Sequence, residues 1–272
     1  MYQTIALFVV LAVPTYNYYY EKLMDMPDVN QSNSTLPGNG SNYCGPASAS
    51  NGLAWLADNG YPDLFDQPDQ VELMRDLGEY CNTNPSNGTG PVSMLNGLED
   101  YIADSGYSIK RLEYQGMRNV IGWSQFNERT PSKDWMMQGL EGNSMVLLGV
   151  GWYEKDGNDY VRNGGHWITL AGYEVPWGVI YASDPSGRSA NAYGSPWHEW
   201  ITLDRLPRTA SVQVESKSFP GNQCYSLGGD LLVNKNRGDV GILDSVIVLE
   251  LNDPPPVVVS PIWYFPWTWF AF

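Results

Sequence analysis

The chain has 272 residues, and 43% of them are hydrophobic, which is enough for the core of one large domain or two small ones. The 15 Lys and Arg residues are outnumbered by 30 Asp and Glu residues, and the net charge of −15 argues against nucleic acid and anionic membrane surfaces as partners. Charged residues make up only 17% of the chain, and this weakly charged, aromatic-rich composition predicts an extracellular or cell-surface location.

Residues 1–30 are interpreted as a separate N-terminal segment. Residues 5–13 are continuously apolar, a length that suits the core of a signal peptide but is too short to span a bilayer. No basic residue precedes this run, and Pro14-Thr15-Tyr16 is not a typical cleavage site. Two interpretations therefore remain open: a signal-like segment, or a retained strand that adds to a sheet edge during assembly.

The main domain is predicted to span residues 31–252 and begins within a loop rich in Asn, Ser and Gly. This loop contains Asn-x-Ser/Thr patterns, and another pattern lies further along the chain. Such patterns carry glycan only in a host that glycosylates, so an unmodified flexible loop is the alternative interpretation. The candidate glycosylation sites are Asn30, Asn33, Asn39 and Asn87.

Helical patterns come first in the main domain, and short β-type runs follow. A helix is predicted to begin at or just after Cys44, and further helices are predicted over residues 69–80, 91–103 and 133–140. Short alternating or apolar runs between turn residues predict strands. Helices followed by antiparallel strands indicate an α+β domain with a helical lobe and a sheet lobe. The predicted strands are residues 107–114, 144–152, 166–173, 179–182, 199–203, 211–215 and 242–251.

Residues 253–272 form a separate tail that is rich in proline and aromatic residues. It is a poor transmembrane helix, because it is short and interrupted by proline. One interpretation is that it packs back on its own domain. The other is that it docks on another subunit or on an envelope surface, since exposed apolar patches usually mark contacts. With the apolar N-terminal segment, it suggests self-association through both ends of the chain.

Cys44 lies at the predicted start of the first helix. A helix N-terminus favours the thiolate and can lower the pKa of a thiol by several units, which is one way to make a nucleophile. The alternative is a buried structural cysteine or half of a disulfide. If Cys44 is the free thiol in an oxidising compartment, Cys81 and Cys224 are left to pair. Three unpaired thiols remain the alternative.

His166 and Asp184 are the candidate partners of the thiol. His166 opens a β-run directly after Gly164-Gly165, and Asp184 follows the next β-run. If these runs form a hairpin, Asp184 can orient His166 as a general base. A packed histidine and a plain Asp-Pro turn are the alternatives. The other histidine, His198, has no cysteine or aspartate cluster at ligand spacing, so no metal and no cofactor are expected.

Cys44-Gly45-Pro46-Ala47-Ser48, then residues 165–173 (GHWITLAGY) and residues 181–187 (YASDPSG), resemble the papain-like cysteine peptidases. They look most like the branch of bacteriocin-processing, double-glycine-leader peptidases and their stand-alone relatives. The resemblance implies a papain-like fold, with Cys44 on the helical lobe and His166 and Asp184 on the sheet. It also implies a peptide or protein substrate and hydrolysis through a thioester.

The chain departs from this family at the oxyanion hole. The family carries a glutamine about six residues before the cysteine, where this chain has Gly38. Asn39 and Asn42 are the nearest side-chain amides and the candidate oxyanion donors. Loss of one donor typically costs ~10²–10³ in rate. Two hypotheses follow: a secreted cysteine peptidase, or a weak or inactive peptidase-fold protein that self-assembles outside the cell.

Overall fold

The structure is a computed structural model that describes residues 18–19, 22–120, 126–174, 178–186, 198–231 and 239–254. The apolar run at residues 5–13 and the tail from residue 255 onwards lie outside the described residues. Their predicted roles in secretion or self-association therefore stay predictions. Within the described part of the chain, no helix is long and apolar enough to cross a membrane.

The helices form where the sequence predicts them. The side chain of Asp69 caps α2 by accepting hydrogen bonds from the backbone N–H groups of Val71 and Glu72, at 2.9 and 3.0 Å. Pro91 begins α3, where its missing N–H costs nothing. Gly106 follows this helix in a left-handed conformation with φ +81°. The α-helices are α1 (Cys44–Asp58), α2 (Gln70–Tyr80), α3 (Pro91–Asp104) and α4 (Lys133–Gln138), with 3-10 turns at Pro37–Gly40, Pro62–Leu64 and Gly221–Gln223.

The strands confirm an α+β fold in which the first three helices precede most of the sheet. Every predicted strand is present, and short strands are added to them. β1 pairs with β5, so part of the N-terminal segment joins the sheet of its own chain. The strands are β1 (Tyr18–Tyr19), β2 (Ile109–Gly116), β3 (Phe126–Glu128), β4 (Ser144–Asp156), β5 (Asp159–Glu174), β6 (Val179–Ser183), β7 (Glu199–Arg205), β8 (Ser211–Val214), β9 (Lys217–Pro220), β10 (Tyr225–Leu227) and β11 (Val240–Leu251).

Six of these strands pair in a closed antiparallel ring. The pairs run from β4 to β5, β6, β7, β10 and β11, and β11 pairs again with β4. Val146, Leu148 and Val150 of β4 belong to one buried cluster, together with Met136 and Met137 of α4. Because the ring is closed, each of the six strands has a partner on both sides, and the enclosed side chains form a packed core.

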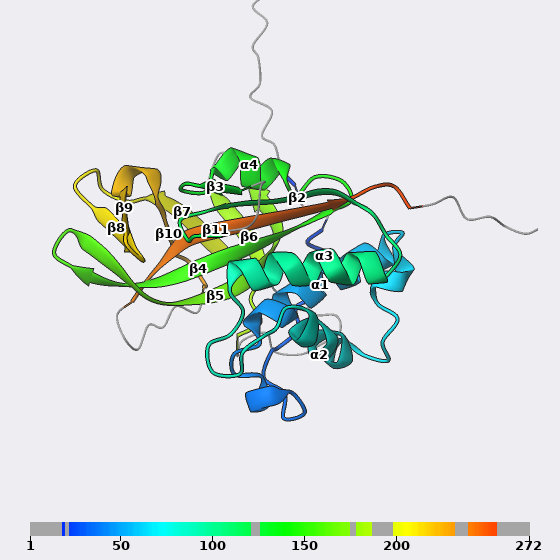
Figure 1. Ribbon diagram of the computed structural model, residues 1–272. Coiled ribbons are helices and arrows are strands. Elements are labelled where there is room, and N and C mark those ends of the chain that lie inside the picture. Colours follow the sequence, from blue (N-terminus) through cyan, green and yellow to red (C-terminus); the bar gives the residue numbers. More distant parts are fainter. Residues whose placement is uncertain are drawn as a thin grey trace, which may run out of the picture.

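The other face of β4 packs against the helices. Met145 and Leu147 alternate with the ring-cluster residues and join a second buried cluster with Leu53 and Leu56 of α1. Figure 1 shows α1, α2 and α3 gathered on one side of the strands. Burial on both faces explains why residues 144–150 read as a continuous apolar run rather than an alternating one. The packing also brings the start of α1 close to β5.

β5 differs from its predicted boundaries. The sequence places the strand start at His166, but the strand begins at Asp159 and includes Gly164 and Gly165 in its interior. The register shifts opposite Trp152 and Tyr153, which is a bulge in the β4–β5 ladder. A glycine pair usually signals a turn, whereas here the turn lies earlier, at Gly157 with φ +60°.

The predicted disulfide between Cys81 and Cys224 is wrong for this structure. Both thiols are buried and free. Cys81 packs in the helix-side cluster with its sulfur 3.9 Å from the sulfur of Met94. Cys224 packs in a different cluster with its sulfur 3.8 Å from that of Met117. The two cysteines behave as small apolar side chains that fill separate parts of the core.

Candidate active site

Cys44 is the first residue of α1, and its side chain is only partly exposed. Pro46 fits the first turn because the N–H that it lacks would have no partner within the helix. The backbone N–H groups of Gly45 and Trp167 favour the Cys44 thiolate and lower the pKa of the thiol. The thiol is thus held at the positive end of the helix dipole, where negative charge is stabilised.

Hydrogen bonds fasten α1 to the strand that carries His166. The hydroxyl of Ser48 donates to the carbonyl oxygen of Trp167 at 2.8 Å, and the hydroxyl of Thr169 donates to the carbonyl oxygen of Ser48 at 2.6 Å. Trp167 also donates its indole N–H to the carbonyl oxygen of Thr89 at 2.9 Å. All of these groups are buried. They fix the position of the thiol relative to the imidazole.

The β5–β6 ladder brings Asp184 to His166. Thr169 is opposite Ser183 in this ladder, so Asp184 follows directly beside the histidine. His166 Nε2 lies 2.6 Å from Asp184 Oδ1, and the Asp184 side chain is 1% exposed. Trp152 stacks on the imidazole, with the ring centroids 6.2 Å apart. Because Nε2 faces Asp184, Nδ1 is the nitrogen left for the thiol.

The charges of the three side chains support one another. Burial disfavours the Cys44 thiolate, but the hydrogen bond and charge of His166 outweigh burial and hold the pKa of the thiol below its usual range. Burial also disfavours the imidazolium, yet Asp184 and Cys44 raise the pKa of His166 above its usual range. For Asp184, burial is outweighed by His166, and the pKa falls. The arrangement therefore favours a thiolate, an imidazolium and a carboxylate.

The other two cysteines show the opposite behaviour. Burial raises the pKa of Cys81 to about 12, and burial raises the pKa of Cys224 to about 12 despite the opposing effect of Arg205. Neither thiol has a histidine beside it. Cys44 is therefore the only one of the three cysteines whose surroundings lower its pKa, which is the property of a reactive cysteine.

The two predicted oxyanion donors lie in different surroundings. Asn42 lines the cavity that contains Cys44, and its Nδ2 donates to the carbonyl oxygen of Pro85 at 2.7 Å. Asn39 is exposed in a left-handed conformation and does not line that cavity. Gln31 is buried nearby, but its Nε2 donates to the carbonyl oxygens of Gly40 and Ser41, both at 3.0 Å. Both amide hydrogens of Gln31 are thus engaged.

A cavity of about 190 Å³ opens beside the thiol and the imidazole. Asn87, one of the predicted glycosylation sites, also lines this cavity, whereas Asn30, Asn33 and Asn39 do not. Glycosylation of any of these asparagines stays a prediction. In the described residues, no group of three His, Cys, Asp or Glu side chains is placed to hold a metal ion.

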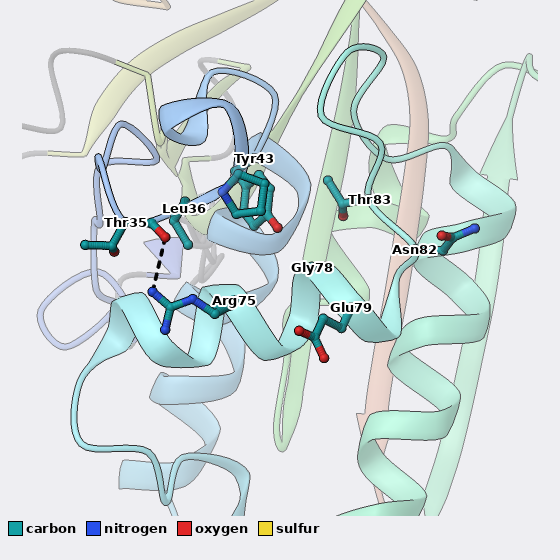
Figure 2. Close-up of a pocket in the computed structure, with 9 residues that line it drawn as sticks. Thr35, Leu36, Tyr43, Arg75, Gly78, Glu79, Asn82 and Thr83 are labelled. Carbon is teal, nitrogen blue, oxygen red and sulfur yellow. Dashed lines mark hydrogen bonds between the residues drawn. The ribbon is translucent and has the colours of Figure 1, made fainter.

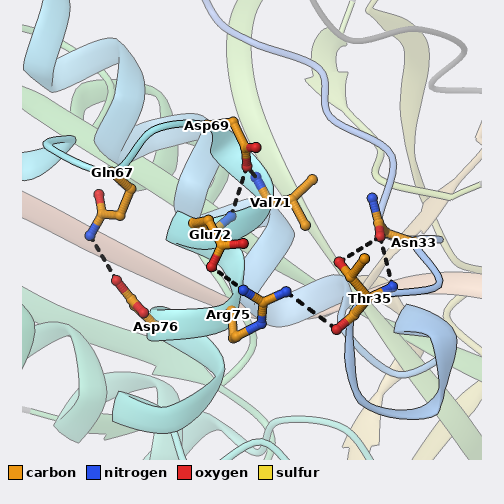
Figure 3. Close-up of polar contacts among 8 residues, drawn as sticks. All are labelled: Asn33, Thr35, Gln67, Asp69, Val71, Glu72, Arg75 and Asp76. Carbon is orange, nitrogen blue, oxygen red and sulfur yellow. Dashed lines mark hydrogen bonds and ion pairs between the residues drawn. The ribbon is translucent and has the colours of Figure 1, made fainter.

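A larger cavity of about 530 Å³ lies on the helical side, between Leu36 and α2. Figure 2 shows Tyr43 and Arg75 among its lining residues. Arg75 is held in place by Glu72 of the same helix and by the carbonyl oxygen of Thr35, at 3.3 Å (Figure 3). The cavity contains neither Cys44 nor His166, although Tyr43 precedes Cys44 in the chain.

Sequence reasoning missed several residues around the thiol. Trp152 stacks on His166, and Arg118, Arg162 and Asp244 line the same cavity as Cys44. These residues come from distant parts of the chain and form no motif. Asp28 is a further example: burial, with the charges of Glu199 and Asp184, raises its pKa to about 8. Trp152, Arg162 and Asp244 lie on β4, β5 and β11, which pair in the closed ring, whereas Arg118 and Asp28 come from segments outside it.

A cysteine on a helix N-terminus and a histidine on a strand that contacts a buried aspartate are the arrangement that the resemblance to the papain-like cysteine peptidases implies. The family model described as the Peptidase_C39 like family matches residues 23–201, and the chain belongs to that family. This agrees with the resemblance to the bacteriocin-processing branch. No curated protein matches the chain.

Proposed function

We propose that the protein is a cysteine peptidase that cleaves peptide or amide bonds with Cys44, His166 and Asp184 as its triad. Membership of a peptidase family supports a peptide or protein substrate. The observation that carries the proposal is the 2.6 Å contact between His166 Nε2 and Asp184 Oδ1, together with the cavity that His166 and Cys44 both line. Cys44, at the start of α1, is the nucleophile, and His166, on β5, is the base.

In the proposed reaction, the Cys44 thiolate attacks the carbonyl carbon of the substrate. As the C–N bond breaks, the His166 imidazolium donates its proton to the leaving amine, and a thioester remains. Water then attacks the thioester and gives a proton to His166. The acid product leaves and the thiolate is restored. Asp184 keeps the imidazole in one orientation and stabilises its charged form throughout.

The oxyanion is proposed to accept hydrogen bonds from the backbone N–H of Cys44 and the side-chain amide of Asn42. An amide nitrogen carries two hydrogens, and the bond to Pro85 uses one of those on Asn42. The second is available for a ligand in the cavity that Asn42 lines. Asn39, which does not line the cavity, is not part of this proposal.

The test is hydrolysis of a mixed library of internally quenched peptides by the purified chain. We expect cleavage by the wild type and none by Cys44→Ala. Cys81→Ala is the matched control, because it removes a buried thiol whose pKa is raised by burial and is not affected by His166. A mass increase on Cys44 after acid quenching would identify the thioester. Equal cleavage by wild type and Cys44→Ala would refute the proposal.

We also propose that the protein acts outside the cell, because its low charge content suits that location. Location stays a proposal, and fractionation of the source cells would test it. The alternative of a self-assembling structural protein depends on the terminal segments, which lie outside the described residues. Light scattering over a range of concentrations would test it.

A further inference from the structure

The cavity beside the thiol contains two arginines. Arg118 and Arg162 line it together with Cys44 and His166. Two cations next to the reactive groups are unexpected in a chain with a net charge of −15. The proposed attack of the thiolate on a peptide bond uses Cys44, His166 and Asp184 and does not require either arginine. The N–H donors of the arginines that the protein does not engage are therefore free to bind another part of the substrate.

Arg162 is held in place by an ion pair with the buried Asp244. Its Nε donates to Asp244 Oδ2 at 2.6 Å, and the side chains of Arg162 and Asp244 are 20% and 2% exposed. A Cβ atom on Gly165 would lie 2.4 Å from Arg162 Nη2, and one on Gly151 would lie 2.6 Å from Asp244 Oδ2. The two glycines therefore leave the space that the ion pair occupies, and Nη2 lies over the backbone beside His166.

Arg162 keeps unused donors. A guanidinium carries five N–H groups, and among the described residues only Nε of Arg162 has a hydrogen-bond partner. Arg118 is also weakly engaged, since its Nε lies 3.7 Å from Glu215, a side chain that is 44% exposed. Asp244 is already occupied by Arg162 and by the hydroxyl of Ser245, at 3.2 Å. The cavity thus offers preorganised cationic donors, and the one carboxylate among its described lining residues, Asp244, is already engaged.

We propose that this cavity binds a carboxylate of the substrate, with Arg162 as the residue that determines specificity and Arg118 as a second cation. The planar fork of arginine matches the two oxygens of a carboxylate, and such charge-assisted hydrogen bonds are among the stronger ones in proteins. The carboxylate is either an acidic side chain next to the scissile bond or the free C-terminus of a peptide. This inference rests on the proposed function for its substrate, although the anion site itself does not.

The first experiment compares two alkylating reagents of similar size, iodoacetate and iodoacetamide. Both form an S–C bond with the thiolate as iodide leaves, but only iodoacetate carries a carboxylate. We expect the iodoacetate to iodoacetamide rate ratio at Cys44 to fall about tenfold in Arg162→Gln/Asp244→Asn, and to fall less in Arg118→Gln. The double variant leaves no buried charge unpaired. Arg75→Gln, in the other cavity, should leave the ratio unchanged.

The ratio is measured at pH 6 and at pH 9, so that two kinds of failure can be distinguished. An arginine-dependent ratio at pH 9 without reaction at pH 6 would reject the activated thiol but support the anion site. An unchanged ratio in both cavity variants, with normal iodoacetamide reactivity, would overturn the anion site. If the double variant does not fold, Arg118→Gln decides alone.

Substrate pairs then identify the source of the carboxylate. Peptides with Glu or Gln beside the scissile bond test a side chain, and free or amidated C-termini test the chain end. We expect one pair to differ about tenfold in kcat/KM with the wild type and to differ little with Arg162→Gln/Asp244→Asn. No difference in either pair, with active enzyme, would refute a role in substrate choice.

Discussion

Removing His166 should abolish the reactivity of Cys44 at mildly acidic pH. A thiol with an ordinary pKa of ~8.5 is only about 0.3% thiolate at pH 6, whereas a thiol paired with an imidazolium is largely ionised. In His166→Ala only burial and two backbone N–H groups remain, so the pKa should return to its ordinary range or rise above it. The thiolate population at pH 6 should then fall by about two orders of magnitude.

The assay is the rate of iodoacetamide labelling of the intact protein from pH 4 to 10, with the labelled residue identified by mass. Low-pKa thiolates are less nucleophilic, which offsets part of the gain, so we expect at least about a tenfold loss of rate at pH 6. Cys81 and Cys224, with pKa values raised to about 12, should contribute ~10⁻⁶ of their population as thiolate at that pH.

The pH at which the labelling rate inflects shows whether His166 lowers the pKa of Cys44, and it does not depend on the absolute rate. We expect the inflection to lie at a lower pH in the wild type, where His166 lowers the pKa of Cys44, than in His166→Ala, where it should be near or above the ordinary thiol value of ~8.5. His198→Asn is the matched control. His198 is the other histidine of the chain, and its Nδ1 lies 3.1 Å from the hydroxyl of Ser183 rather than beside the thiol. Identical inflections in wild type and His166→Ala would refute the thiolate–imidazolium pair.

Three further predictions concern the surroundings of the triad. Asn42→Ala should lower kcat by ~10²-fold with little change in KM, and an unchanged kcat in steady-state kinetics would remove Asn42 from the oxyanion hole. Ser48→Ala should lower the free energy of unfolding by about 1–3 kcal/mol in urea titrations, because the carbonyl oxygen of Trp167 loses the Ser48 hydroxyl as a partner. Ser105→Ala, which removes a partly buried hydrogen bond within the end of α3, is the control, and equal losses in the two variants would contradict the role of Ser48 in joining α1 to β5. Asp28 holds a proton up to about pH 8 in the fold but only up to about 4 when unfolded, so wild-type stability should fall as pH rises between these values. Asp28→Asn should remove this slope and gain stability at pH 9 but not at pH 4, and parallel curves for the two proteins would show that Asp28 does not titrate as expected.

The part of the site that depends on local sequence was predictable. Pro46 and the apolar spacing behind it mark a helix that starts at Cys44. The β-run predicted to open at His166 and the β-run that ends just before Asp184 are neighbours in the sheet, as expected. A hairpin fixes its own register over a few residues, so the contact between His166 and Asp184 follows from local pairing. Residue chemistry and chain order were enough for this step.

The rest depends on contacts between distant segments. Nothing in the spacing of Cys81 and Cys224 shows that they lie in different clusters, so the disulfide prediction failed. In the sequence, Gly164-Gly165 indicates a turn. In the structure, the missing side chain of Gly165 allows the close approach of the Arg162 guanidinium, which would lie 2.4 Å from a Cβ atom at this position. That approach depends on the bulge in β5 and on Asp244 of a strand much later in the chain. Sequence patterns report periodicity within an element, whereas these features arise from closure of the ring.

The triad and the arginine site share a physical constraint, which is that each buried charge depends on a partner. Removing one member of a buried ion pair leaves the other without compensation and typically costs ~3–5 kcal/mol. In Arg162→Gln alone, a loss of anion binding could not be distinguished from the destabilisation caused by leaving the buried Asp244 carboxylate without its partner. Asp244→Asn in the same chain restores the balance of charge. If the double variant is as stable as the wild type and still loses the preference for iodoacetate, then the cation itself, and not the integrity of the cavity, selects the substrate.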